Sequence, residues 1–111
     1  MTIASSDISP LDVVIADVYL EDKPDVSKPR PVVVLEVDDD LLVVVGLKVT
    51  SHPPRPWVAG EVVLQDWKEE GLMKPSVARC SKKVALTLPD IKLRCGSLSG
   101  RDRMAVLSSI F

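Results

Sequence analysis

Arg30 is the side chain whose neighbours in the sequence first suggest chemistry. Pro29 biases Lys28 towards extended geometry, and Pro31 removes a backbone donor directly before a valine-rich run. A guanidinium held between two prolines loses less entropy when it binds an anion, and its planar fork matches a phosphate or carboxylate with two hydrogen bonds. We therefore expect Arg30 at the point where a loop becomes a strand, as an anion ligand. The alternative is a solvated charge at a strand end.

A second polar group, Thr50, Ser51 and His52, follows a predicted strand over residues 41–49. Prolines within residues 53–56 then exclude both a helix and a regular strand ladder, so the chain must turn there. Two hydroxyls and an imidazole at the end of a rigid strand are well placed to face a ligand. The alternative is turn chemistry, in which the hydroxyls bond to nearby backbone groups and His52 lies in solvent.

The elements that must position these residues are mainly β-strands. Runs rich in valine, isoleucine and leucine, bounded by proline, glycine and aspartate, are typical of strands. The runs cover residues 11–19, 31–37, 41–49, 57–64, 74–88 and 91–96. An acidic turn at residues 38–40 predicts an antiparallel hairpin, and Gly46 predicts a bulge or bend.

Three further segments complete the predicted architecture. Residues 20–28 form a polar connection, either an ordinary hairpin loop or a flap over whatever Arg30 binds. Residues 65–72 form a short helical turn or loop, in which we expect Trp67 to be a core residue rather than a base-stacking platform. From Ser99, a plausible cap, the spacing of Met104, Leu107 and Phe111 predicts a terminal helix packed on the sheet.

Length and composition indicate one small domain over residues 11–111, preceded by a flexible leader over residues 1–10. Cys80 and Cys95 are expected to be reduced thiols. No secretory signal or membrane-spanning run is recognisable, so a cytoplasmic protein is expected. The net charge of −2 divides into −6 through Thr50 and +4 after it, which is too weak for tight non-specific binding to nucleic acid.

Several motifs are missing from the sequence. It contains no glycine-rich phosphate loop, no nucleophile elbow and no His, Cys or carboxylate set with metal-ligand spacing. These absences argue against nucleotide hydrolases and zinc enzymes, and no helix pattern suits the DNA major groove. The low aromatic content also argues against an SH3-like adaptor for proline-rich peptides.

Taken in order, the features resemble the MazF/PemK family of toxins from bacterial toxin–antitoxin pairs. The resemblance extends from Leu11 to Leu107. It rests on Leu11-Asp12-Val13-Val14, Arg30-Pro31 with the following valines, Thr50-Ser51, Gly71-Leu72, Lys74-Pro75-Ser76-Val77 with Arg79, and Gly96-Ser97-Leu98-Ser99. The glycine that precedes the first aspartate in the family is absent here.

The resemblance implies an SH3-like β-barrel with a C-terminal α-helix. It further implies a homodimeric, sequence-specific endoribonuclease that cleaves single-stranded RNA without a metal or other cofactor. The ribose 2′-hydroxyl would attack the adjacent phosphate and leave a 2′,3′-cyclic phosphate and a 5′-hydroxyl. The residues that match the family's catalytic positions are Arg30, Thr50 and Arg79. The implied partner is a small antitoxin with a disordered, acidic tail.

One departure from the family concerns the base. Some PemK-like toxins carry an aspartate two places after the arginine that matches Arg79, and Ser81 stands there in this chain. A serine cannot take a proton at neutral pH, so Asp12 or His52 would have to act instead, or the chain would bind nucleic acid or protein without cleavage. The expected substrate contacts are Lys28, Ser51, His52, Asp12 and Ser81.

Overall fold

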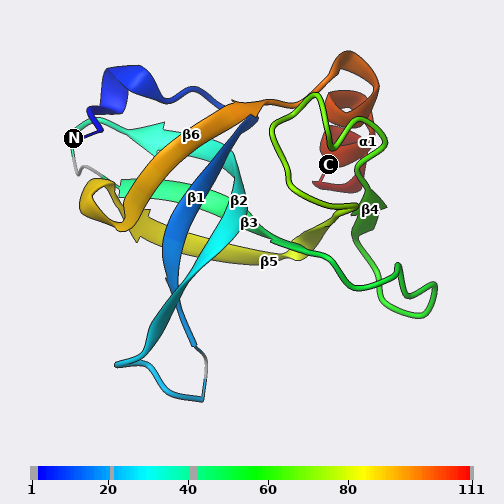
Figure 1. Ribbon diagram of the computed structural model, residues 1–111, viewed down its shortest axis with the longest axis horizontal. Helices are drawn as coiled ribbons and strands as arrows, with labels where there is room; N and C mark the ends of the chain where they lie inside the picture. The colour runs from blue at the N-terminus through cyan, green and yellow to red at the C-terminus, as the bar shows by residue number, and fades with distance from the viewer. Residues whose placement is uncertain (1–2, 21, 41–42, 111) are drawn as a thin grey trace.

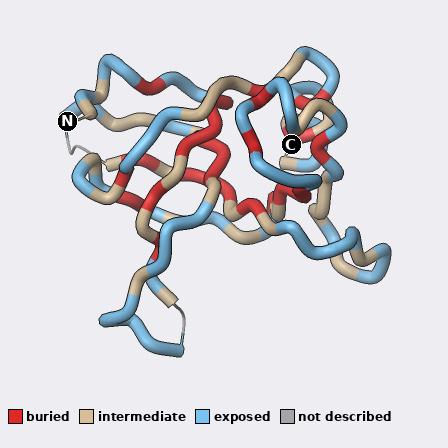
Figure 2. Tube along the Cα trace, in the orientation of Figure 1, coloured by how far each residue is buried: buried red, intermediate tan, exposed pale blue. Residues whose placement is uncertain are grey.

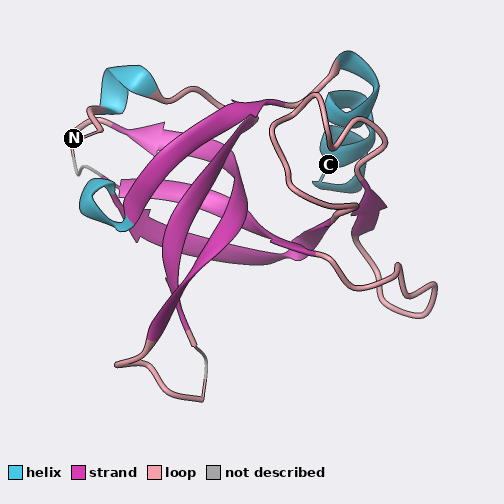
Figure 3. Cartoon of the chain, viewed as in Figure 1, coloured by secondary structure: helices cyan, strands magenta, loops and turns pink. Residues whose placement is uncertain are grey.

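The computed structural model of the chain describes residues 3–20, 22–40 and 43–110. Within these residues, six strands form one antiparallel sheet in the order β4-β5-β3-β2-β1-β6, which curls around its own core, and a helix follows (Figures 1 and 3). The strands are β1 (Asp12–Tyr19), β2 (Ser27–Asp38), β3 (Val43–Thr50), β4 (Glu61–Val63), β5 (Val77–Thr87) and β6 (Ile91–Ser97). The helices are the 3-10 turns η1 (Ser5–Asp7) and η2 (Leu88–Asp90) and the α-helix α1 (Gly100–Ile110). The predicted mainly β fold with a C-terminal helix is confirmed.

Both faces of the central strands are buried, which explains why their valine runs are continuous rather than alternating. On β1, Val13 faces one core and Val14 the other, and Val33 and Val32 do the same on β2. The first core contains Leu11, Val13, Val33, Leu47, Val49, Leu64, Leu72, Ala78, Cys80, Leu98 and Val106. The second core contains Ile8, Val14, Ala16, Val18, Val32, Val34, Val44, Leu86 and Ile91. Buried residues accordingly concentrate in the strands, while residues 22–26 between β1 and β2 and most of the β3–β4 loop are exposed (Figure 2).

Gly46 lies where the sheet bends most closely on itself. A Cβ at this position would overlap Val32 Cγ1 and lie 3.0 Å from the Val33 carbonyl oxygen. The β2–β3 register shifts between Val34 and Glu36, opposite Gly46, so the predicted irregularity is present but the extra residue is on the partner strand.

The strand predicted over residues 57–64 is wrong for its first half. Only Glu61–Val63 forms β4, and Trp57 is 79% exposed in the loop before it. The loop closes because the Glu61 carboxylate accepts the Arg55 backbone N–H at 2.8 Å, and Gly60, with φ +83°, turns the chain into the strand. The predicted strand start at residues 41 and 42 lies outside the described residues.

Helix α1 begins as predicted, but its buried face differs in part from the expected one. The Ser99 hydroxyl accepts the Asp102 backbone N–H at 3.3 Å, which confirms Ser99 as the cap. Leu107 packs against the first core as predicted, as do Val106 and Ile110, whereas Met104 is 68% exposed. The helix is turned this way because Asp102, four residues before Val106, is itself buried. Phe111 lies outside the described residues.

Several smaller expectations also meet structural evidence. Trp67 packs against the first core, as predicted. Cys80 and Cys95 are free thiols, and burial raises the pKa of both. Within the expected leader, Ile8 is buried in the second core. No helix among the described residues is long and apolar enough to cross a membrane.

Candidate functional site

Arg30 lies inside a strand rather than at its mouth. β2 begins at Ser27, and Arg30 pairs with Ala16 of β1, between the pairs formed by Pro29 and Pro31. Two prolines are tolerated here because β2 has no β3 partner before Val32, so their nitrogens can face that unpaired edge. The position expected at a loop–strand junction is thus corrected to an exposed strand position, with the backbone fixed by pairing to β1.

The strand register places Arg30 and Thr50 on the same face of the sheet. The last β2–β3 pair is Val32 with Lys48, and two more residues along each strand lie Arg30 and Thr50, at the same level. Here β2 continues into the hairpin with β1, while β3 continues towards the β3–β4 loop, so the two strands diverge (Figure 1). Arg30 and Thr50 therefore stand on either side of the point where the sheet opens.

Arg79 is on this face too, one strand further. It pairs with Lys48 on β3 and with Glu61 on β4. Because residues directly paired across strands share a face, Arg79 lies beside Lys48 and two residues from the level of Thr50. The three residues predicted to act together are thus carried by β2, β3 and β5 on one face, where the second core gives way to polar side chains.

The guanidinium groups on this face have donors to spare. Among the described residues Arg30, which is exposed, has no side-chain hydrogen bond or ion pair. The Arg79 Nε is buried without a hydrogen-bond partner there, and its nearest acidic oxygen, Glu61 Oε2, is 3.7 Å away. A buried donor without an acceptor is unfavourable, and the part of the Arg79 side chain that is exposed, 26% of it, is accessible to an anion.

Glu61 was missed by the sequence analysis. Its side chain is only 3% exposed, and Arg55 holds it with Nη2 at 2.6 Å and Nε at 3.1 Å. The hydrogen bonds from Arg55 lower the pKa of Glu61, so this carboxylate is a weak base that lies beside Arg79. A sequence signal was available, since an arginine among prolines and an acid six residues later can close a loop.

Ser51 and His52 lie exposed at the end of β3. Thr50 Oγ1 accepts the His52 backbone N–H at 3.2 Å, which is the turn chemistry proposed as the alternative for this segment. Ser51 and His52 also line a pocket of about 320 Å³ together with Pro53, Pro54, Val63, Leu64, Gln65, Trp67, Pro75, Ser76 and Val77. The backbone therefore turns as the alternative predicts, and Ser51 and His52 border a cavity; that these side chains face a ligand stays a prediction.

Lys28 and Ser81 occupy two different surroundings. Lys28 is exposed on β2, paired with Val18, two residues from Arg30 and on its face. Ser81 is exposed in a bulge of β5, where the pairing with β3 jumps from Lys83 to Arg79. Lys28 thus extends the positive charge around Arg30.

Asp12 has a carboxylate that is already bound. It is buried at the start of β1 and accepts Arg94 Nε at 2.9 Å, the Ser97 hydroxyl at 2.6 Å and the Ser9 backbone N–H at 2.9 Å. Burial raises the pKa of Asp12, but the hydrogen bonds from Arg94, Ser97 and Ser9 outweigh it, so the pKa is lowered. These contacts join β1 to β6 and suit a structural role rather than that of a base.

Comparison with known proteins gives one result on the fold. No family model matches the chain, and no curated protein matches it by sequence. Among solved structures, the Mycobacterium tuberculosis toxin MazF-mt6 is similar, with a TM-score of 0.65 and 24% sequence identity over 87% of this chain and 91% of that chain. The chain therefore has a MazF-like fold.

Proposed function

We propose that the protein is a toxin endoribonuclease that cleaves single-stranded RNA at the face formed by Arg30, Thr50 and Arg79. The observation that carries this proposal is the pair of guanidinium groups with unused donors on one face of a MazF-like sheet. RNA offers a phosphate at every nucleotide, and arginine forks bind phosphate with paired hydrogen bonds. Thr50 lies between the two arginines along the sheet and presents a hydroxyl to the same anion.

The reaction rearranges bonds within the RNA and needs, besides these side chains, a base and a proton donor. The ribose 2′-oxygen attacks the adjacent phosphorus, the bond from phosphorus to the 5′-oxygen breaks, and a 2′,3′-cyclic phosphate and a 5′-hydroxyl result. Arg30 and Arg79 stabilise the additional negative charge that the phosphate oxygens develop. Since Thr50 Oγ1 accepts a backbone N–H, its own proton is free to bond with a phosphate oxygen.

We assign the proton of the 2′-hydroxyl to His52, and water supplies the proton that the leaving 5′-oxygen takes. Asp12 and Glu61 are held by arginines, and Ser81 cannot accept a proton at neutral pH. The His52 imidazole makes no hydrogen bond among the described residues and is exposed beside Thr50. His52→Ala should lower the cleavage rate about 10²-fold with folding intact. An unchanged cleavage rate would exclude His52 as the base.

The decisive experiment uses the full chain with long single-stranded RNA in the presence of EDTA. We expect fragments that end in 2′,3′-cyclic phosphate and begin with 5′-hydroxyl. An otherwise identical RNA with one 2′-deoxyribose at the cut should stay intact there. Fragments that carry 5′-phosphates, or equal cutting of the deoxy substrate, would contradict the proposed reaction.

A second candidate is a binding module with the same face and no cleavage. Ser81 favours it, because this position offers no carboxylate, and so does Glu61, which offsets part of the charge on Arg79. RNA and its 2′-deoxy copy would then bind equally, with no products from either. That outcome would retain the anion-binding face and exclude the nuclease.

We also propose a small antitoxin whose acidic tail covers the same face, and a homodimer as the assembly. Guanidinium donors without hydrogen-bond acceptors, and the exposed Lys28 beside Arg30, suit carboxylates as well as phosphates. Growth arrest on expression of the chain alone, relieved by an adjacent small open reading frame, would support the antitoxin. Sedimentation of the purified chain as a monomer at micromolar concentration would exclude the dimer.

A further inference from the structure

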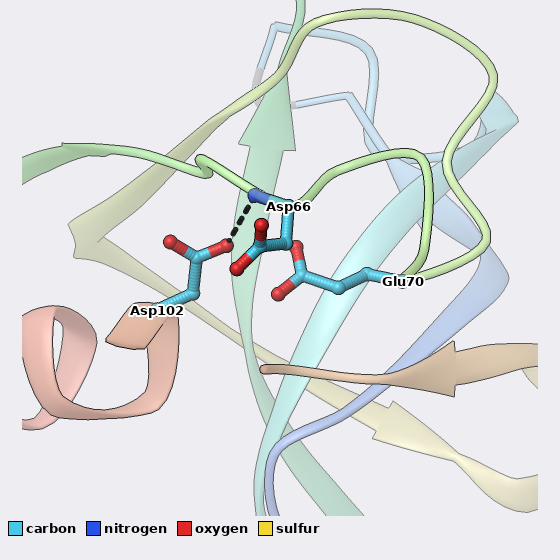
Figure 4. A group of neighbouring side chains, drawn as sticks. All are labelled: Asp66, Glu70 and Asp102. Carbon is cyan, nitrogen blue, oxygen red and sulfur yellow. Dashed lines mark hydrogen bonds between the residues drawn. The ribbon is translucent and has the colours of Figure 1, made fainter. Parts of the chain in front are cut away.

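A cluster of three carboxylates lies where the β4–β5 loop meets helix α1. It is separate from the face that carries Arg30, Thr50 and Arg79, called the cationic face below. Asp66 and Glu70 come from the loop and Asp102 from the first turn of the helix. One carboxylate oxygen from each lies within 4.8 Å of the others, and Figure 4 shows the three side chains pointing towards one another. Nothing in the proposed reaction uses this group.

The known hydrogen bonds hold these carboxylates in place. The Asp102 oxygens accept the Gln65 and Asp66 backbone N–H groups, each at 2.9 Å. Glu70 Oε2 accepts the Ser99 N–H at 2.7 Å. Arg101 binds both oxygens of Asp66, at 2.8 and 2.6 Å, and its hydrogen bonds lower the pKa of Asp66 to about 2. Each carboxylate is therefore fixed by donors and still has lone pairs left.

Glu70 supplies the independent evidence that something else belongs in the cluster. It is 1% exposed, and its Oε1 is buried with no hydrogen-bond partner among the described residues. The Asp102 carboxylate, which is also buried, lies beside it. Arg101 offsets only one of the three negative charges, and uncompensated buried charge is costly.

We propose that Asp66, Glu70 and Asp102 form a structural site for a hard divalent cation, with Ca²⁺ as the best fit. The donors are all oxygens, which hard cations prefer. Three oxygens within 4.8 Å of one another can converge on one ion, and Ca²⁺, with flexible geometry and Ca–O distances of about 2.4 Å, suits such a set better than Mg²⁺, which requires about 2.1 Å and stricter geometry. The cation would bind Glu70 Oε1 and tie the β4–β5 loop to α1, next to the pocket that Gln65 and Trp67 line.

The first test is thermal unfolding of the full chain at pH 7.5, stripped with EDTA and then titrated with CaCl₂. We expect a saturable rise of the midpoint, on the order of 10 °C at about 100 times Kd, and a smaller rise with MgCl₂. Glu70→Gln should abolish the Ca²⁺ response. Glu69→Gln, an exposed neighbour of the same chemistry, should keep it.

A second readout does not depend on the stability of a variant. Tb³⁺ occupies Ca²⁺ sites and emits when a nearby tryptophan is excited, and Trp67 follows Asp66 directly. We expect sensitised Tb³⁺ emission that excess Ca²⁺ displaces and that Trp67→Phe removes, while Trp57→Phe retains it. These readouts involve no RNA, so their failure leaves the nuclease proposal intact.

Three results would overturn the cation site. The first is an unchanged midpoint in 10 mM Ca²⁺ with no displaceable Tb³⁺ emission. The second is an equal Ca²⁺ response in Glu70→Gln, which would place the ion elsewhere. The third is stabilisation between pH 8 and pH 6 without any Ca²⁺ effect, which would show that a proton on Glu70 neutralises the cluster.

Discussion

Two charged regions of the molecule are built in opposite ways. On the cationic face, Arg30 has no side-chain partner among the described residues, and the Arg79 Nε has no hydrogen-bond acceptor there. Where the β4–β5 loop meets α1, the carboxylates of Asp66 and Asp102 accept N–H donors at every oxygen. The contrast separates guanidinium donors that are unused in the fold from carboxylates that already hold the loop to the helix, with or without the proposed cation, and substitutions in the two regions should have different effects.

The largest effect should come from Arg30→Ala. Removing one charge-stabilising donor should lower the cleavage rate about 10²- to 10³-fold with no change in the unfolding midpoint. Arg103→Ala removes the same group from an exposed position on α1 and should leave the rate unchanged. A loss of rate that accompanies a loss of stability would show that Arg30 holds the fold together rather than binding a ligand.

The matching change in the acidic region is Asp102→Ala. It leaves the Gln65 and Asp66 N–H groups without acceptors, so unfolding in urea should show a loss of about 3 kcal/mol. Glu69→Ala, on the exposed side of the loop, should cost less than about 0.5 kcal/mol. If both variants are equally stable, the loop is not held by Asp102.

The architecture could be predicted from the sequence because it depends on local signals. Valine runs separated by Asp38 to Asp40, and a serine before the last helical pattern, were sufficient for the strands and for the Ser99 cap. The face of α1 was predicted only in part, since Leu107 packs on the core and Met104 does not. Asp102 is buried to serve N–H groups 36 and 37 residues earlier in the chain, and no helical spacing reveals such a partner.

The same distinction between local signals and distant contacts applies to the candidate site. Residue types at Arg30, Thr50 and Arg79 suggested an anion site, but their common face depends on pairing among β2, β3 and β5. Asp12 was suggested as a base because its type and position suited one, although Arg94, 82 residues later, already binds it. Glu61 was missed because its relation to Arg79 exists only across two paired strands.

The pH dependence of stability tests whether the Asp12 carboxylate helps to hold the fold together. Its pKa is lowered in the fold, so its contribution to stability is complete above the unfolded value near 4 and is lost as the pH falls through the folded value. Asp12→Asn should cost about 2 kcal/mol at pH 7, since water screens the half-exposed Arg94, and the difference from wild type should shrink below pH 4. Urea unfolding across this range measures it, with the exposed Asp25→Asn as control. A constant difference down to pH 2.5 would refute the linkage.

The smallest effect is expected from Glu61→Gln. Glu61 both closes a loop through Arg55 and lies beside Arg79 on the cationic face. The amide can keep a hydrogen bond with Arg55 but no longer offsets the charge of Arg79. The affinity for a 2′-deoxy RNA analogue should rise about threefold, measured by fluorescence anisotropy, with Glu69→Gln unchanged. A lower affinity would indicate that Glu61 positions Arg79 rather than opposing its charge.

The central claim is that Arg30, Thr50 and Arg79 bind one anion together. A crystal structure of the chain with an RNA that carries 2′-deoxyribose at the cleavage position tests this most directly. We predict one phosphate whose oxygens accept hydrogen bonds from both guanidinium groups, with the Thr50 hydroxyl on the same phosphate. A bound RNA whose phosphates contact Arg30 and Arg79 separately, or neither of them, would contradict the account.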